Sequence, residues 1–123
     1  MTSPHQIHSF LYRAEKEMAD PGDAGIIRVS EDLQICQMVS DDAETRTLAR
    51  PTKVGIQFVL RLMTDGGTVT VTVTNGLNVA GNTVATFADA SDIISLVSVE
   101  YTAGPPKTYR WQVLEGNVGV ALS

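Results

Sequence analysis

The sequence has little of several residue classes, and each shortage excludes a kind of protein. Among 123 residues there is one cysteine, so the chain can form neither an intrachain disulfide nor a cysteine-rich zinc site. Only 9 residues are Lys or Arg against 14 Asp or Glu, and this net charge of −5 disfavours binding to nucleic acid or to an anionic membrane surface. No apolar run approaches the roughly 20 residues that span a bilayer, and the N-terminus lacks the apolar core of a signal peptide.

What is present is one domain's length of chain, with 43% hydrophobic residues, enough for a single core. From Gly25 onward, apolar and polar residues alternate in short runs, and pairs of turn residues separate the runs. Turn signals at a spacing of roughly 8–12 residues are typical of sandwiches and barrels. The pattern predicts an all-β, single-domain β-sandwich or barrel of about eight short antiparallel strands.

The N-terminal segment has a different period. Ser3 and Pro4 form a helix start, and apolar residues then recur three and four positions apart, at Ile7, Phe10, Leu11, Ala14 and Met18. We therefore predict a short amphipathic helix over 3–18. The chain divides into an N-terminal helix or arm, 1–19, and a β domain, 20–123.

The most regular strand signal lies in the middle of the chain. Threonine alternates with valine from 68 to 74, which indicates a half-buried strand, and the turn at 64–67 predicts a hairpin with the strand before it. A flat, uncharged, β-branched strand of this kind is prone to pair with another chain if it lies at an edge. The pattern leaves two alternatives open, a central strand or a contact with another chain.

Residues that could carry catalysis or bind a metal are few. His5 and His8 are three residues apart, but no third metal ligand lies near them in the sequence, and the acidic residues Asp41, Asp42, Glu44, Asp89 and Asp92 lie in turns without calcium-loop spacing. We expect no metal, no cofactor and no enzymatic activity. The remaining enzymatic alternative is a small hydrolase that uses Asp41 or Asp92 with an N-terminal histidine.

Two further features are ambiguous in the sequence. Cys36 has no activating base beside it and is expected to be an inert, packed thiol. Tyr109 and Trp111 share one face of a late strand, where they either fill the core or form a platform on which a sugar could stack. The second possibility defines an alternative function, a carbohydrate-binding β-sandwich for adhesion to a host surface.

The order and spacing of turns and strands also resemble those of a known protein family. The resemblance rests on the segments 20–25, 43–52, 62–69, 75–76, 80–83, 109–113 and 119–123. Taken together, they resemble small structural proteins of tailed-bacteriophage virions, the head decoration or cement proteins, which include head-fibre proteins. The predicted N-terminal helix lies outside the resemblance.

The resemblance implies a non-enzymatic protein that binds the assembled major capsid protein on the outer surface of the virion. It also implies a homo-oligomer, with a trimer favoured, that binds neither nucleic acid nor membrane. No contact residues can be transferred from the family position by position. We expect the apolar stripe of the N-terminal helix to make the contact with the capsid or with a neighbouring subunit, through Ile7, Phe10, Leu11, Ala14 and Met18.

Overall fold

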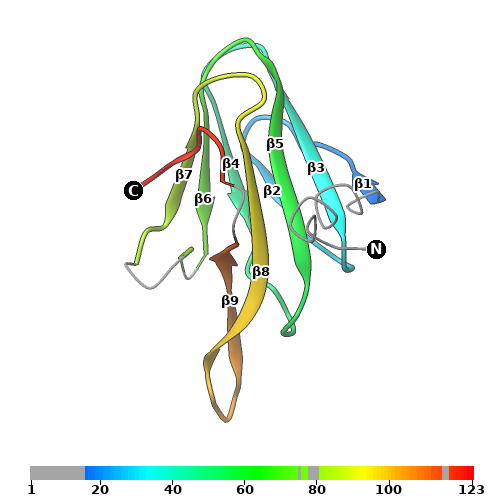
Figure 1. Cartoon of the computed structure of the whole chain (residues 1–123), viewed down its shortest axis with the longest axis vertical. Coiled ribbons are helices and arrows are strands. Elements are labelled where there is room, and N and C mark those ends of the chain that lie inside the picture. Colours follow the sequence, from blue (N-terminus) through cyan, green and yellow to red (C-terminus); the bar gives the residue numbers. More distant parts are fainter. Residues whose placement is uncertain (1–15, 75, 78–80, 115–116) are drawn as a thin grey trace, which may run out of the picture.

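The protein is a sandwich of two five-stranded sheets (Figure 1). The computed structural model describes residues 16–74, 76–77, 81–114 and 117–123. Its strands are β1 (Lys16–Met18), β2 (Gly25–Ile27), β3 (Gln34–Ser40), β4 (Glu44–Leu48), β5 (Gln57–Asp65), β6 (Val69–Val73), β7 (Val84–Phe87), β8 (Ile93–Thr102), β9 (Thr108–Val113) and β10 (Ala121–Leu122). Sheet A has the order β1-β3-β5-β8-β9, and sheet B has the order β10-β7-β6-β4-β2. The predicted all-β sandwich is confirmed.

The first six strands form three stacked arches, where an arch is one strand of each sheet and the turn that joins them. The arches are β1–β2, β3–β4 and β5–β6. Successive arches stack in parallel, so β1, β3 and β5 are parallel neighbours in sheet A, and β2, β4 and β6 are parallel neighbours in sheet B. Parallel neighbours need a crossover between them, and here a strand of the opposite sheet provides it. This connectivity is that of a short β-solenoid.

The arches correct two expectations. Strand pairing is not antiparallel throughout: the pairs between successive arches are parallel, whereas β5–β8, β8–β9, β6–β7 and β7–β10 are antiparallel. The turn after β5 does not close a hairpin, because β5 and β6 belong to different sheets. Alternation along a strand shows which side is buried, but it does not show which sheet the next strand joins.

Close packing between arches explains the two glycines of the third turn. A Cβ atom at Gly66 would collide with the backbone of Ser40 and Asp41, and one at Gly67 would collide with the backbone of Asp42 and Ala43. The second and third turns therefore run against each other, at the top of Figure 1. The glycines are required for this approach of two backbones and not for a positive φ, since neither has one.

The core lies between the sheets and is formed by one side of each strand. In β6 the valines point inward and the threonines outward, as the alternation predicts. The strand is central, between β4 and β7, so no edge of it is free to pair with another chain. Trp111 is fully buried, with its ring centroid 5.8 Å from that of Phe58, and its Nε1–H donates to the carbonyl oxygen of Ala49 at 2.9 Å.

The N-terminal helix prediction is wrong at its C-terminal end. Residues 16–18 form the edge strand β1, which pairs with β3, so the β domain includes residues assigned above to the arm. Met18 is partly buried against the core and is not part of an exposed helical stripe. Three residues of edge strand carry too little periodicity to be separated from the helical pattern that precedes them. The rest of the stripe, Ile7, Phe10, Leu11 and Ala14, lies outside the described residues.

We expect Trp111→Phe to lower the free energy of unfolding by about 2 kcal/mol, because the smaller ring leaves a cavity and the half-buried carbonyl of Ala49 loses the indole N–H as its donor. Urea denaturation measures this change. Tyr101→Phe is the matched control, since it removes only a hydroxyl from a ring that is 53% exposed. The control should stay within about 0.5 kcal/mol of the parent. Equal stabilities of the parent and Trp111→Phe would contradict the packing described here.

Candidate functional site

The side chains suspected of chemistry serve structural roles where the structure describes them. Cys36 faces the core with Gln34 and Met38, as the alternation predicts. Burial, reinforced by the charge of Asp20, raises the pKa of the Cys36 thiol to about 12. A thiol with this pKa is protonated at neutral pH and is a poor nucleophile.

The acidic turn residues bind backbone amides of their own turns. Asp92 is buried, and its carboxylate accepts hydrogen bonds from the N–H groups of Ala88 and Asp89 at 3.0 and 3.1 Å. Asp42 accepts one from Ala43 at 2.8 Å. Within the described residues, no group of His, Cys, Asp and Glu side chains could hold a metal ion. His5 and His8 lie outside this part of the chain.

One charged residue lies at an inward-facing position that the sequence pattern does not predict. Arg46 is on the inward side of β4, with a fully buried side chain. Its Nε and Nη2 donate to the two carboxylate oxygens of Asp20 at 2.7 and 2.8 Å, and Nη2 also donates to the carbonyl oxygen of Val39 at 3.1 Å. Nη1 lies 3.0 Å from a carboxylate oxygen of Glu44 as an ion pair. These contacts join the first and second arches, because Asp20 lies in the turn of the first.

The ion pair with Arg46 helps to lower the pKa of the Asp20 carboxyl group. Burial alone would raise its pKa, but hydrogen bonds from Arg46 and from the backbone N–H groups of Val39 and Gly22 outweigh burial and lower the pKa below its ordinary value of 3.8. The ionised carboxylate therefore stabilises the folded state. This stability is present above about pH 3.8 and is lost as the pH falls through the pKa of the folded protein.

The outer face of sheet B is an uncharged array of threonines. Thr45 on β4 lies opposite Thr70 on β6, which lies opposite Thr86 on β7, and Thr47 lies opposite Thr72. The other outward residues of these strands and of their neighbours β2 and β10 are Ile26, Val84 and Ala121. We call this surface the threonine face. No described strand of sheet B places a charged side chain on it, although 14 acidic residues are present in the chain.

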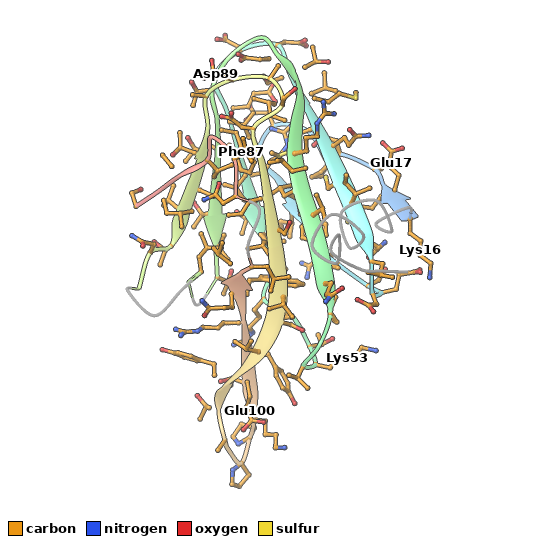
Figure 2. All side chains as sticks on the ribbon, viewed as in Figure 1. Lys16, Glu17, Lys53, Phe87, Asp89 and Glu100 are labelled. Atoms are coloured by element: carbon orange, nitrogen blue, oxygen red, sulfur yellow. The ribbon has the colours of Figure 1, made fainter. Side chains whose placement is uncertain are left out.

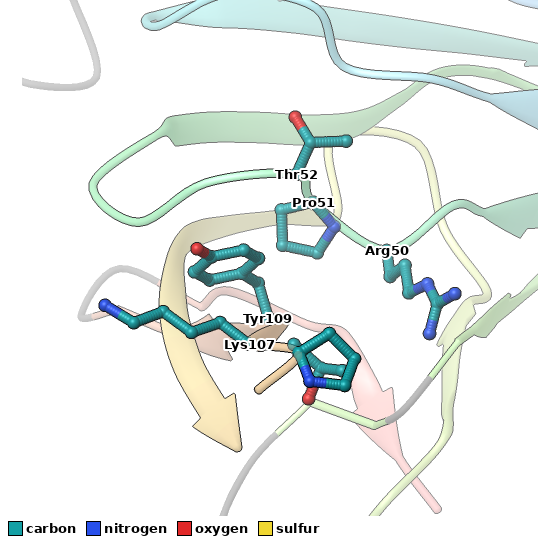
Figure 3. A pocket seen from close by; sticks show the side chains of 7 residues that line it. Arg50, Pro51, Thr52, Lys107 and Tyr109 are labelled. Atoms are coloured by element: carbon teal, nitrogen blue, oxygen red, sulfur yellow. The ribbon is translucent and has the colours of Figure 1, made fainter. Parts of the chain in front are cut away.

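Two adjoining hollows lie near the loop that follows β4. The first, of about 330 Å³, is lined by Arg50, Pro51, Thr52, Pro106, Lys107, Thr108 and Tyr109 (Figure 3). The second, of about 380 Å³, is lined by Ile26, Arg28, Thr47, Ala49, Arg50, Thr52 and Thr74. Arg50 and Thr52 line both hollows, so the two adjoin, and we call them together the Arg50 groove.

The structure separates the two aromatic residues that the sequence places together. Trp111 is core, so it cannot form half of a sugar platform. Tyr109 is half-buried and lines the Arg50 groove, where Figure 3 shows its ring between Pro51 and Lys107. Sequence reasoning missed the basic groove because Arg28, Arg50 and Lys107 are far apart in the chain. Only the fold brings their strand ends together.

The overall comparison with known proteins gives no family: no protein-family model matches the chain, and no curated protein matches it. In the part of the chain that the structure describes, no helix is long and apolar enough to cross a membrane.

We expect Asp20→Asn to cost about 2–3 kcal/mol at neutral pH, because it leaves the buried Arg46 guanidinium with one fewer carboxylate. The variant should also lose less stability than the parent as the pH falls from neutral to about 2, since the group with the lowered pKa is absent. Urea denaturation over a pH series measures both effects. Asp65→Asn is the control, because it removes the same charge from an exposed position at the end of β5 with no ion pair among the described residues. Equal costs for both variants would show that Asp20 has no special role.

Proposed function

We propose that this protein is a non-enzymatic structural protein of a tailed-bacteriophage virion, which binds the assembled major capsid protein on the outside of the head and stabilises the shell. The observation that carries the proposal is the threonine face. Charged residues are depleted at the centres of protein interfaces because their desolvation is costly, whereas a short hydroxyl side chain is desolvated at lower cost and can still form hydrogen bonds. The resemblance to head decoration proteins supplies the identity of the partner.

Stabilisation would follow from selective binding. A protein that binds the assembled lattice but not free capsid subunits shifts the equilibrium toward the lattice in proportion to its affinity and concentration. We propose that the protein acts as a homotrimer, because three linked copies engage several capsid subunits at once and gain avidity without new kinds of contact. The net charge of −5 supports a position outside the shell, away from packaged nucleic acid.

The apolar stripe of the N-terminal segment remains part of this proposal, but with fewer residues. Met18 packs against the protein's own core and is not available for a partner. Ile7, Phe10, Leu11 and Ala14 remain candidates for a second contact, with the capsid or with another copy of the chain.

The proposed alternative, a carbohydrate-binding sandwich for host adhesion, loses its original basis. That function needs a Tyr109–Trp111 platform at the surface, but the indole of Trp111 is buried between the sheets. Tyr109 alone remains at the surface groove. The first hollow of the groove shares no residue with the threonine face, so a ligand in that hollow is compatible with a protein that is bound to a capsid through the threonine face.

The proposal is tested by mixing the purified protein with undecorated capsids and measuring co-sedimentation. We expect the parent to sediment with the capsids and Thr72→Asp to bind at least roughly tenfold more weakly, because the substitution places a carboxylate at the centre of the threonine face. Met63→Asp is the matched control, since it adds the same carboxylate at a strand position of sheet A that is 42% exposed. The control should bind like the parent.

Two outcomes would count against the proposal. If the parent does not co-sediment with capsids, the function itself is wrong. If Thr72→Asp and Met63→Asp bind equally well, the capsid contact lies elsewhere on the protein. Circular dichroism of both variants checks that each is folded before binding is compared.

A further inference from the structure

The Arg50 groove gathers positive charge on an acidic protein. Arg28, Arg50 and Lys107 line it, and none of its lining residues is acidic. Within the described residues, neither Arg28 nor Arg50 forms an ion pair. Lys107 lies 3.6 Å from the carboxylate of Glu100, but both side chains are largely exposed, so the pairing is weak. The groove therefore presents positively charged side chains to a ligand, although the net charge of the protein is negative.

The cations flank a surface suited to a flat ring. In Figure 3 the Lys107 ammonium and the Arg50 guanidinium extend to opposite sides of the Tyr109 ring, and Pro51 lines the same hollow as that ring. Tyr109, Pro51 and Pro106 provide an apolar wall, of which Pro51 is buried and thus held in place. Tyrosine presents a rigid apolar face of this kind with a polar tip.

Hydroxyl groups complete the lining. Thr52 and Thr108 belong to the first hollow, and Thr47 and Thr74 belong to the second. The Thr108 Oγ1 atom is buried and has no hydrogen-bond partner in the protein. A ligand that carries both hydroxyl groups and anionic groups would satisfy this lining, since threonine both donates and accepts and the three cations only donate.

We propose that the Arg50 groove binds an acidic oligosaccharide, a chain of sugar rings that carry carboxylates. One ring would pack on Tyr109, its hydroxyls would bond to threonines, and carboxylates on successive rings would meet Lys107, Arg50 and Arg28 in turn. The separation of the cations along two hollows favours an extended ligand over a single small anion. This inference does not depend on the proposed capsid function.

Single-stranded nucleic acid is the competing polyanion, and the groove suits it less well. Proteins that bind it use several aromatic rings on which successive bases stack. Tyr109 is the only aromatic residue that lines either described hollow.

The test is isothermal titration calorimetry of the full chain with a short oligogalacturonate. The control ligand is its methyl ester, which has the same rings and no charge. We expect the acid to bind and the ester to bind at least tenfold more weakly, since each charge-assisted hydrogen bond is about twice as strong as a neutral one. Added salt should weaken binding of the acid and leave the ester unaffected.

Substitutions of the lining residues test whether the ligand binds in the Arg50 groove. Arg50→Gln should weaken binding of the acid roughly tenfold, and Glu100→Gln should tighten it, because it releases Lys107 from its partner. Lys53→Gln is the charge-matched control, since Lys53 is exposed and lines neither hollow. It should bind like the parent. Tyr109→Phe keeps the ring and should retain binding, whereas Tyr109→Thr should lose most of it.

The proposal is overturned if the methyl ester binds as tightly as the acid, or if Arg50→Gln and Lys53→Gln weaken binding equally. It is also overturned if an oligothymidylate of similar length binds more tightly than the oligogalacturonate, which would assign the groove to nucleic acid. Because these variants lie outside β6, a failure here leaves the Thr72→Asp result on capsid binding intact. A failure of capsid binding likewise leaves the calorimetry interpretable.

Discussion

The stacking of the arches depends on the buried guanidinium of Arg46. Its partners come from the turn of the first arch, from β3 and from β4, so a single side chain fixes the first arch against the second. A buried arginine without these partners would be strongly destabilising. Because each arch contributes one strand to each sheet, fixing the first two arches holds β1 against β3 and β2 against β4 at once. The parallel pairing then continues to β5 and β6, and the threonine face lies on β4, β6 and β7.

Periodicity was sufficient to predict the class of fold and the orientation of many side chains. The alternation in 68–74 identified the inward valines and the outward threonines, and the alternation around Cys36 placed its thiol on the side with Met38. The pairing of strands could not be obtained in this way, because parallel and antiparallel neighbours need the same alternation. Gly66 and Gly67 signal a turn in either case, and only the contact with the second arch shows that it links two sheets.

The candidate surfaces were harder to predict than the fold. Each strand that contributes to the threonine face shows only one or two threonines in its own segment, and the array exists only once β4, β6 and β7 are in register. The groove depends on residues as distant as Arg28 and Lys107. The two surfaces adjoin, since Thr47 and Ile26 belong to both. A protein attached to a shell through the threonine face would thus hold the groove beside the attachment. Figure 2 shows Glu100 on the β8–β9 hairpin, which projects from one end of the sandwich.

Attachment through the threonine face is the central claim, and the orientation of the bound protein tests it most directly. A cryo-electron microscopy reconstruction of capsids incubated with the protein would show that orientation. The account predicts added density on the outer surface of the shell, with sheet B against the capsid and sheet A facing solvent. Density with sheet A against the capsid, or capsids without added density at saturating protein, would contradict it.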